Sequence, residues 1–371
     1  MSRPMIRLTR IERYVMVRTL MGVGAALAVI TAVILLIDFV ELSRTVGVRA
    51  KEVTPFDVFG LAMLESPSVI LVLLPFAFLF GVLAAFVNLN RHSELVAMRA
   101  AGLSAWRFIL PAAGAAVAIG VLTVVALNPI ASAMNARFQR VQGDMMEGYL
   151  PEAQKAIWLR QGDGRTQIII RGDSRIPGAP VRLKTVSMFV YAVDDDGALR
   201  FSRRIDAAEA WLTRGQWRLT KAREATAGAE AVDYDSLSIP TNLDEHTALQ
   251  RTAAAQAVPF WSLPGVIRAT EGAGFSATTY RLQLHQLLAT PVLFAAMSIL
   301  AAAFSLRLLR LGGLAALAGA GVALGFVVFF LNQFSMALGR ADLLPPFVAA
   351  WTPPILALLA GVTLLCYTED G

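Results

Sequence analysis

Six runs of apolar residues, each long enough to cross a lipid bilayer, constrain this chain of 371 residues more than any other feature. A helix rises about 1.5 Å per residue, so roughly 20 apolar residues span a hydrocarbon core of about 30 Å. Buried helices of a large soluble protein are the alternative, but only 16% of the residues are charged, against about 25% in soluble domains. The runs cover, approximately, residues 19–39, 68–87, 108–130, 287–306, 314–338 and 347–366.

Three runs precede and three follow a polar insert of roughly 150 residues. Within it, apolar residues alternate at period two, as in Leu199–Ile205 and Trp217–Leu219. Short alternating strands separated by turns indicate a sandwich or jelly roll. We therefore predict an α-helical membrane protein with six transmembrane helices, three plus three, flanking a periplasmic β-jellyroll-like domain. The predicted parts are residues 1–131, 132–283 and 284–371.

Three local features of this fold are also predicted. Pro67 is expected in the first turn of the second helix. The third helix should continue beyond the membrane with a kink at Asn128-Pro129. In the insert, Phe201 and Ile205 should share one face of a strand, because side chains alternate at period two.

Arginine placement predicts the orientation of the helices. Five arginines lie in the first 18 residues, and Arg91, Arg99 and Arg107 lie between the second and third runs. Arginine-rich ends and loops stay in the cytoplasm. The first apolar run is longer than the core of a signal peptide, so we expect it to be retained. We predict a multi-pass protein of the bacterial inner membrane with cytoplasmic termini and a periplasmic insert.

Sequence motifs for catalysis are missing from the chain. It has no G-x-x-x-x-G-K-[ST] phosphate loop and no G-x-S-x-G serine elbow. His92 and His246 are predicted on opposite sides of the membrane, and the one cysteine, Cys366, has no partner for a disulfide. The excess of basic residues lies beside helix ends, which argues against nucleic-acid binding. We expect no catalytic residue, no metal ligand and no cofactor in this chain.

The segment 89–104, between the second and third runs, carries the clearest local pattern. Ser93 is placed to cap a helix, Glu94 follows at its positive end, and Gly102 can end it in a left-handed conformation. A short helix of residues 93–102 is the shape with which a permease docks on an ATPase; a surface turn on lipid headgroups is the alternative. The expected coupling residues, with Leu95 and Met98 on the presented side, are Arg91, Ser93, Glu94, Leu95, Met98, Arg99 and Gly102.

The segment Asn90–Gly102 closely resembles the cytoplasmic segment of the lipopolysaccharide-exporter permeases LptF and LptG. The order of three helices, a β insert and three helices matches that family along essentially the whole chain. Residues Ile157–Arg160, Val186–Val193, Gly215–Leu219 and Pro259–Pro264 resemble the LptG branch more than the LptF branch.

The resemblance implies a set of partners. One LptF-like and one LptG-like permease would pair in the inner membrane, above an LptB-like ATPase dimer that binds ATP and Mg²⁺. An LptC-like single-span protein would join them. Lipopolysaccharide would enter between the first and fifth helices of opposite subunits and pass to the β domains. Glu94 would pair with a basic residue of the ATPase.

The resemblance also implies residues that contact the lipid. Family members often carry basic residues at the outer end of the first helix, near the lipid phosphates. This chain departs from that pattern with Asp38 and Glu41, which repel phosphate unless an arginine or a divalent ion neutralises them. Arg44 is either a phosphate partner or a snorkelling interfacial arginine. The aromatic residues expected to face the lipid cavity are Phe326, Phe329 and Phe330.

The function expected from these patterns is that of a non-catalytic permease subunit of an ATP-driven lipopolysaccharide exporter. The paralogous subunit LptF is the near alternative. A membrane-anchored sensor or assembly factor, whose β domain only binds partners, is an alternative of another class. An intramembrane enzyme is disfavoured, because such enzymes carry paired ionisable residues at mid-membrane.

Overall fold

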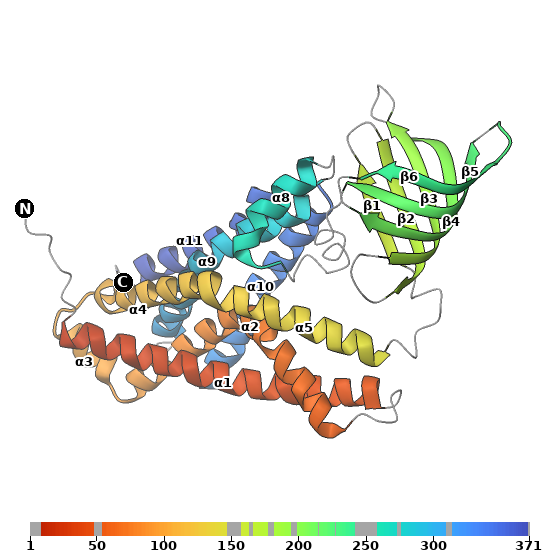
Figure 1. The fold of residues 1–371 in the computed structure, drawn as a ribbon. Coiled ribbons are helices and arrows are strands. Elements are labelled where there is room, and N and C mark those ends of the chain that lie inside the picture. Colours follow the sequence, from red (N-terminus) through yellow and green to blue (C-terminus); the bar gives the residue numbers. More distant parts are fainter. Residues whose placement is uncertain are drawn as a thin grey trace, which may run out of the picture. The chain divides into compact units, whose positions relative to one another are not determined.

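A computed structural model provides the structure of the chain (Figure 1). It describes residues 9–47, 54–146, 157–162, 166–176, 182–193, 199–213, 215–226, 228–241, 258–272, 276–308 and 314–369. Residues 1–8 and His246 lie outside this described part. The chain divides into a helical unit, Met1–Gln139 with Val258–Leu263 and Thr278–Gly371, and a β unit, Arg140–Ala257 with Pro264–Ala277.

Six helices of the described part are long and apolar enough to cross a membrane, which confirms the predicted spans. Most of them are longer than the apolar runs, because flanking residues that include polar and charged side chains continue the helices. The first is α1 (Arg10–Gly47), the second α2 (Pro55–Arg91), and the third the continuous series α4 (Ala105–Leu122), η1 (Thr123–Leu127) and α5 (Asn128–Met146). The last three are α9 (Thr278–Leu308), α10 (Leu314–Arg340) and α11 (Pro346–Glu369).

The start of α2 differs from the sequence prediction. Pro67 lies inside the helix, which begins twelve residues earlier at Pro55. Thr54 explains this early start, because its hydroxyl accepts a hydrogen bond from Asp57 N while the Asp57 carboxylate accepts one from Thr54 N. Such a capping box satisfies backbone donors that a helix start leaves unpaired.

The main buried core of the helical unit lies around α9, which packs against α2, α4 and α11. A smaller buried cluster consists of Leu282, Met336, Ala349 and Ala350. Phe78 of α2 and Phe294 of α9 stack with ring centroids 4.8 Å apart and are fully buried. Glycine allows the closest helix crossings: a Cβ added to Gly22 of α1 would lie 2.4 Å from Gly81 O of α2. These backbones therefore touch, in the manner of small-residue packing between membrane helices.

The irregularity expected at Asn128-Pro129 is a five-residue π-helix, η1, directly before these residues. Pro129 has no N–H to donate to the carbonyl four residues earlier, which is Val125 O. Trp261 supplies the missing donor, with its indole N–H 3.1 Å from Val125 O. The Phe260 N–H donates to Asn128 Oδ1 at 2.9 Å. The short 3-10 turn η3 (Phe260–Ser262) is thus bound to the π segment.

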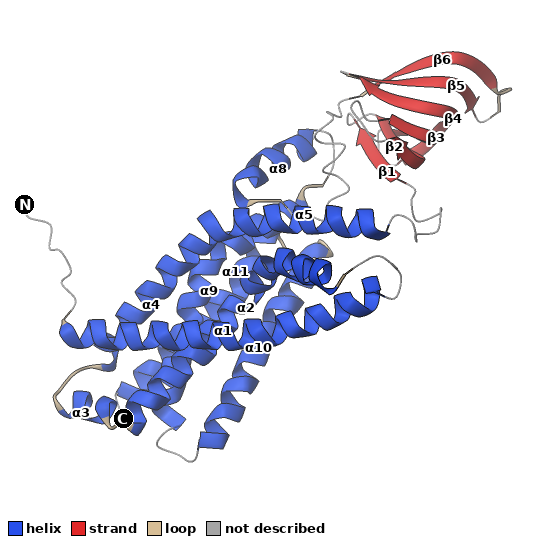
Figure 2. Cartoon of the chain, turned by 60° about the horizontal axis from the view of Figure 1, so that its bottom comes forward, coloured by secondary structure: helices blue, strands red, loops and turns tan. Residues whose placement is uncertain are grey.

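The β unit contains one antiparallel sheet of six strands in the order β1-β2-β3-β4-β5-β6 (Figure 2). This confirms the predicted β-rich insert between the helices. The described strands follow one another as a meander, without the crossover connections that define a jelly roll. The strands are β1 (Ile157–Gly162), β2 (Thr166–Ile176), β3 (Arg182–Val193), β4 (Leu199–Thr213), β5 (Gln216–Thr226) and β6 (Val232–Pro240).

One face of this sheet forms the core of the β unit, with Trp217 and Leu219 fully buried, as their alternation predicts. Gln161 of β1 is buried there and accepts the indole N–H of Trp217 at 3.1 Å through its Oε1. Its Nε2 donates to Pro240 O at the end of β6 at 3.3 Å. The first strand therefore contacts the last two through one side chain, so the sheet curls.

The prediction that Phe201 and Ile205 share a face is wrong. A bulge between Val190 and Tyr191 shifts the register of β4 by one residue. An extra residue reverses the alternation of side chains beyond it. Ile205 is accordingly buried, whereas Phe201 is 48% exposed and lies against the Tyr191 ring at 5.8 Å.

The unit boundaries differ from residues 131/132 and 283/284. The third helix belongs to the helical unit as far as Gln139, and α9 already begins at Thr278. A short helix, α8 (Leu263–Gly272), precedes α9, and from Pro264 on it belongs to the β unit.

Candidate functional site

Two parts of the helical unit hold the residues that the sequence singled out. One is α3 (Glu94–Ala100), the helix between α2 and α4. The other consists of the exposed faces of α1 and α10. The starts of α1 and α4 and the end of α11 lie on the same side of the helical unit as α3 (Figure 1), which we call the α3 side.

The end of α3 is built as the sequence predicts. Gly102 has φ +80, a left-handed conformation that side-chain-bearing residues avoid. Its N–H donates to Arg99 O at 2.9 Å, and Leu103 N–H donates to Met98 O at 3.2 Å. These two bonds form a Schellman motif, which ends the helix sharply and satisfies its last carbonyls.

The expectation that Ser93 caps α3 is wrong. Ser93 occupies the cap position, but its backbone is left-handed, with φ 56, and its side chain makes no capping hydrogen bond. A capping serine needs extended backbone so that its hydroxyl faces the first turn. The chain turns too tightly for this between α2 and α3, where Ser93 N–H bonds to Asn90 O at 2.8 Å.

The faces of α3 also differ from the expected arrangement. Leu95 is 1% exposed and belongs to the core of the helical unit, and Met98 packs against that core. Val96 is 59% exposed, and Ala97 and Ala100 are exposed beside it. Leu95 and Met98 therefore anchor α3, and the small apolar side chains on its other face are available to a partner.

Hydrogen bonds fasten both ends of α3 to distant helices. Glu94 Oε1 accepts the Tyr14 hydroxyl of α1 at 3.2 Å. Tyr14 in turn accepts the Arg18 Nε at 3.1 Å. At the other end, the Arg99 guanidinium donates to Thr368 O of α11 at 3.1 Å. Arg91, the last residue of α2, is exposed beside them.

Tyr14 and Arg18 are site residues that the sequence reading missed. Their spacing of four residues places them on one face of α1, but the arginine was interpreted only as an orientation charge. The contact of Tyr14 with Glu94, 80 residues further along the chain, depends on the packing of α1 against α2 and carries no local sequence signal.

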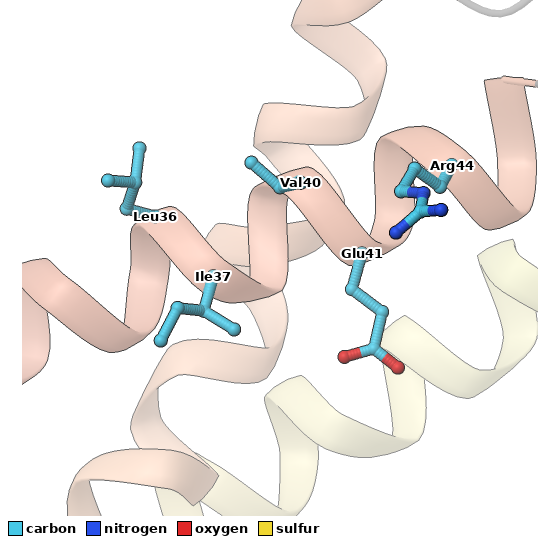
Figure 3. Close-up of a pocket in the computed structure, with 5 residues that line it drawn as sticks. All are labelled: Leu36, Ile37, Val40, Glu41 and Arg44. Carbon is cyan, nitrogen blue, oxygen red and sulfur yellow. The ribbon is translucent and has the colours of Figure 1, made fainter.

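On the side of the helical unit opposite α3, the C-terminal part of α1 carries a shallow pocket of about 590 Å³, which we call the outer pocket. Its apolar part is well exposed, with Leu36 at 65% and Ile37 at 55%. The Glu41 carboxylate and the Arg44 guanidinium extend from the same helix beside these side chains (Figure 3). Within the described residues, the lining consists of Leu36, Ile37, Val40, Glu41 and Arg44.

Asp38, which the sequence grouped with Glu41 and Arg44, does not line this pocket. It is partly buried, and its Oδ2 has no hydrogen-bond partner in the described part of the chain. Glu65 of α2 lies within electrostatic range of both Asp38 and Glu41. Among the described residues, no group of three acidic, histidine or cysteine side chains is arranged to hold a metal ion.

The exposed aromatic face of α10 contains two of the three expected residues, with Phe334 in place of Phe329. Phe326 and Phe330 are 64% and 60% exposed, with ring centroids 6.3 Å apart. The next stacked ring is that of Phe334, 6.4 Å from Phe330. Phe329 instead points to α2, where its ring lies 5.5 Å from Phe76. The spacing of four residues was the signal for Phe334.

Comparisons with known proteins agree with this architecture. A family model described as "Lipopolysaccharide export system permease LptF/LptG" matches residues 13–367. The lipopolysaccharide export system permease protein LptG of Escherichia coli K12 is 24% identical over 346 residues, covering 89% of this chain and 90% of the relative. The LptG protein of Escherichia coli O6:H1, strain CFT073, matches with the same values. With its six membrane helices and a family match along nearly its whole length, the chain belongs to the LptF/LptG family of lipopolysaccharide export system permeases.

Proposed function

We propose that this chain is the LptG-type subunit of an ATP-driven lipopolysaccharide exporter in the bacterial inner membrane. The LptG assignment is supported by the LptG-like segments Ile157–Arg160, Val186–Val193, Gly215–Leu219 and Pro259–Pro264, beside the two LptG relatives matched at 24% identity over 89% of the chain. The LptF role is the second candidate. An LptF-like permease, an LptC-like single-span protein and an LptB-like ATPase dimer would complete the exporter.

The observation that carries the docking proposal is the construction of α3. A helix of seven residues is held by buried Leu95 and ended by Gly102, so that Val96, Ala97 and Ala100 face away from the core. Small apolar side chains ringed by charges suit a groove on a soluble partner. In this proposal α3 is the coupling helix, and Glu94 meets a basic residue of the ATPase.

Hydrolysis is assigned to the partner and not to this chain. The sequence has no phosphate loop, and ATP and Mg²⁺ would bind to the LptB-like dimer. Extraction of a lipid needs an external source of work, because each acyl CH₂ taken out of the bilayer costs about 0.8 kcal/mol. The proposed role of this chain is to convert that work into movement of the lipid.

The outer pocket of α1 and the aromatic face of α10 are the proposed lipid contacts. Leu36, Ile37 and Val40 offer an apolar surface for acyl chains, next to the cation of Arg44. Arg44 forms no salt bridge within the described residues, so a lipid phosphate is a suitable partner for its guanidinium. Glu41 opposes that phosphate unless Arg44 or a divalent ion compensates its charge.

The proposed orientation places α3 and both termini in the cytoplasm and the β unit in the periplasm. Arg10, Arg13 and Arg18 of α1 and Arg91, Arg99 and Arg107 around α3 concentrate positive charge on the α3 side. Positive charge of this kind stays in the cytoplasm. The β unit would then receive the lipid on the other side.

Co-purification with the ATPase tests this function. The Glu94→Arg variant and the wild type are expressed in the native host and purified from its membranes in mild detergent. Wild type is expected to bring an LptB-like ATPase with it, and Glu94→Arg to lose most of it while remaining in the membrane, because two cations would then face each other.

The matched control is Glu230→Arg, the same change at an exposed residue of the β unit. It should retain the ATPase. A photocrosslinker at exposed Val96 should also capture the ATPase directly. Equal amounts of ATPase with wild type and Glu94→Arg, together with no crosslink from Val96, would contradict docking at α3.

A further inference from the structure

The α3 helix is bonded to the helix that carries the outer pocket. Glu94 Oε1 accepts the Tyr14 hydroxyl at 3.2 Å, and the Tyr14 oxygen accepts Arg18 Nε at 3.1 Å. The Arg18 guanidinium also lies over the Tyr14 ring, 5.3 Å from its centroid. A cation that donates to a phenol oxygen strengthens the bond that the phenol donates to a carboxylate. The three side chains form one chain of interactions from α1 to α3.

A second contact joins the same part of α1 to the chain just after α3. The Glu12 carboxylate pairs with the Arg107 guanidinium of α4 at 2.9 Å. Arg107 follows the last residue of α3 by only seven positions. Glu12 and Tyr14 therefore hold the first turns of α1 to the segment that includes α3, and a displacement of α3 would pull on both.

The structure of helix α1 allows a displacement of α3 to be transmitted along α1. It is continuous over 38 residues, without proline, and it touches the backbone of α2 where Gly22 meets Gly81. Its part near α3 is packed, with Val15, Thr19 and Val23 buried, whereas Leu42 is the one buried residue between positions 24 and 44. Tyr14 lies about 12 Å and Glu41 about 28 Å from Gly22 along the axis, at about 1.5 Å per residue.

We infer that Tyr14, oriented by Arg18, is a positioning residue that links α3 to α1, so that movement of α3 reaches the outer pocket through α1. In this movement α1 pivots at its crossing with α2, where Gly22 meets Gly81. The part of α1 from the crossing to Glu41 is longer than the part from the crossing to Tyr14, so the displacement is larger at the outer pocket than at α3. The inference rests on the proposed function, because the force on α3 comes from the ATPase.

The test measures the number of lipid molecules released per ATP hydrolysed by the complete exporter in proteoliposomes. The Tyr14→Phe variant keeps the ring and removes only the hydroxyl. It is expected to bind the ATPase and hydrolyse ATP as wild type does, but to release about two- to tenfold less lipid per ATP, the factor carried by one hydrogen bond. Arg18→Gln should lower the same ratio in the same direction.

Tyr367→Phe is the matched control, because it removes a hydroxyl from an exposed tyrosine of α11. It should leave the ratio unchanged. An unchanged ratio in Tyr14→Phe would overturn the inference, and so would loss of the ATPase from that variant, since Tyr14 would then act on docking. A wild-type complex that holds no ATPase would contradict the proposed function itself.

Discussion

At the scale of single residues, the charge of Arg44 determines whether the outer pocket attracts or repels a lipid phosphate. The Arg44→Glu variant removes a cation and adds an anion beside Glu41, so lipid binding should weaken. Photocrosslinking of lipopolysaccharide from Val40 is expected to fall about two- to tenfold, as for loss of a charge-assisted hydrogen bond. Arg340→Glu, at the exposed end of α10, is the control. Equal crosslinking in both variants would make Arg44 an ordinary interfacial arginine.

Glu209 in the β unit gives a prediction about pH. Its hydrogen bond to Arg182 holds the pKa of the carboxyl below its ordinary value of 4.5, with further help from the charge of Arg182 and a bond from Trp211. A carboxyl with a lowered folded-state pKa stabilises the fold above its unfolded pKa, and this stabilisation is lost as the pH falls through the folded pKa.

The full chain in detergent should therefore lose thermal stability between pH 7 and pH values below 4.5 more steeply than its Glu209→Gln variant. Asp233→Gln, at an exposed residue whose nearest Arg223 nitrogen is 3.8 Å away, is the control and should follow the wild type. Parallel curves for wild type and Glu209→Gln would show that the Arg182 contact contributes nothing.

The sequence predicts a site residue well where local backbone chemistry decides its role. Gly102 was identified because only a left-handed residue ends a helix in this way. Ser93 was misread, since its left-handed backbone follows from the turn after α2 and not from its own propensity. The sequence predicts Phe329 on the exposed face and does not indicate Phe334, because the direction of a ring on an apolar helix depends on the neighbouring helix.

At the scale of elements, the crossing of α1 and α2 leaves no space for an added side chain. A Cβ on Gly81 would lie 2.3 Å from Val23 Cα of α1, so any side chain there separates the two backbones. Gly81→Leu is expected to cost about 1–3 kcal/mol, as overpacking does elsewhere. The thermal unfolding midpoint in detergent should fall. Gly24→Leu, where nothing lies within 4 Å, should have no such effect; equal midpoints would contradict a tight crossing.

The elements differ in how far their sequences predict them. Apolar runs locate all six spanning helices, but they miss the first turns of α1 and α2, where charged residues interrupt the apolar pattern. Pro129 signals an irregular third helix, whereas the π form and its partner Trp261 require tertiary structure. In the sheet, the alternation of apolar residues predicts the buried face around Trp217. The bulge near Tyr191 has no corresponding sequence pattern, so it could not be predicted.

At the scale of the whole molecule, the order of helices, insert and helices follows from hydropathy alone, because a bilayer leaves an apolar run of 20 residues few alternatives. The open faces of α1 and α10 do not follow from it. A helix that is apolar on all sides gives the same pattern whether protein or lipid covers it. The family resemblance indicated the exposed rings of Phe326 and Phe330, whereas the exposure of Leu36 and Val40 on α1 came only from packing.

We propose that a partner of this chain performs the work of transport, and reconstitution tests that claim most directly. The chain is purified with its co-purifying subunits, placed in liposomes that contain lipopolysaccharide, and assayed for ATP hydrolysis and lipid release with and without the ATPase. We predict that both activities require the ATPase subunit and that the isolated chain hydrolyses no nucleotide. ATP turnover by the isolated chain, or lipid release without the ATPase, would contradict the account.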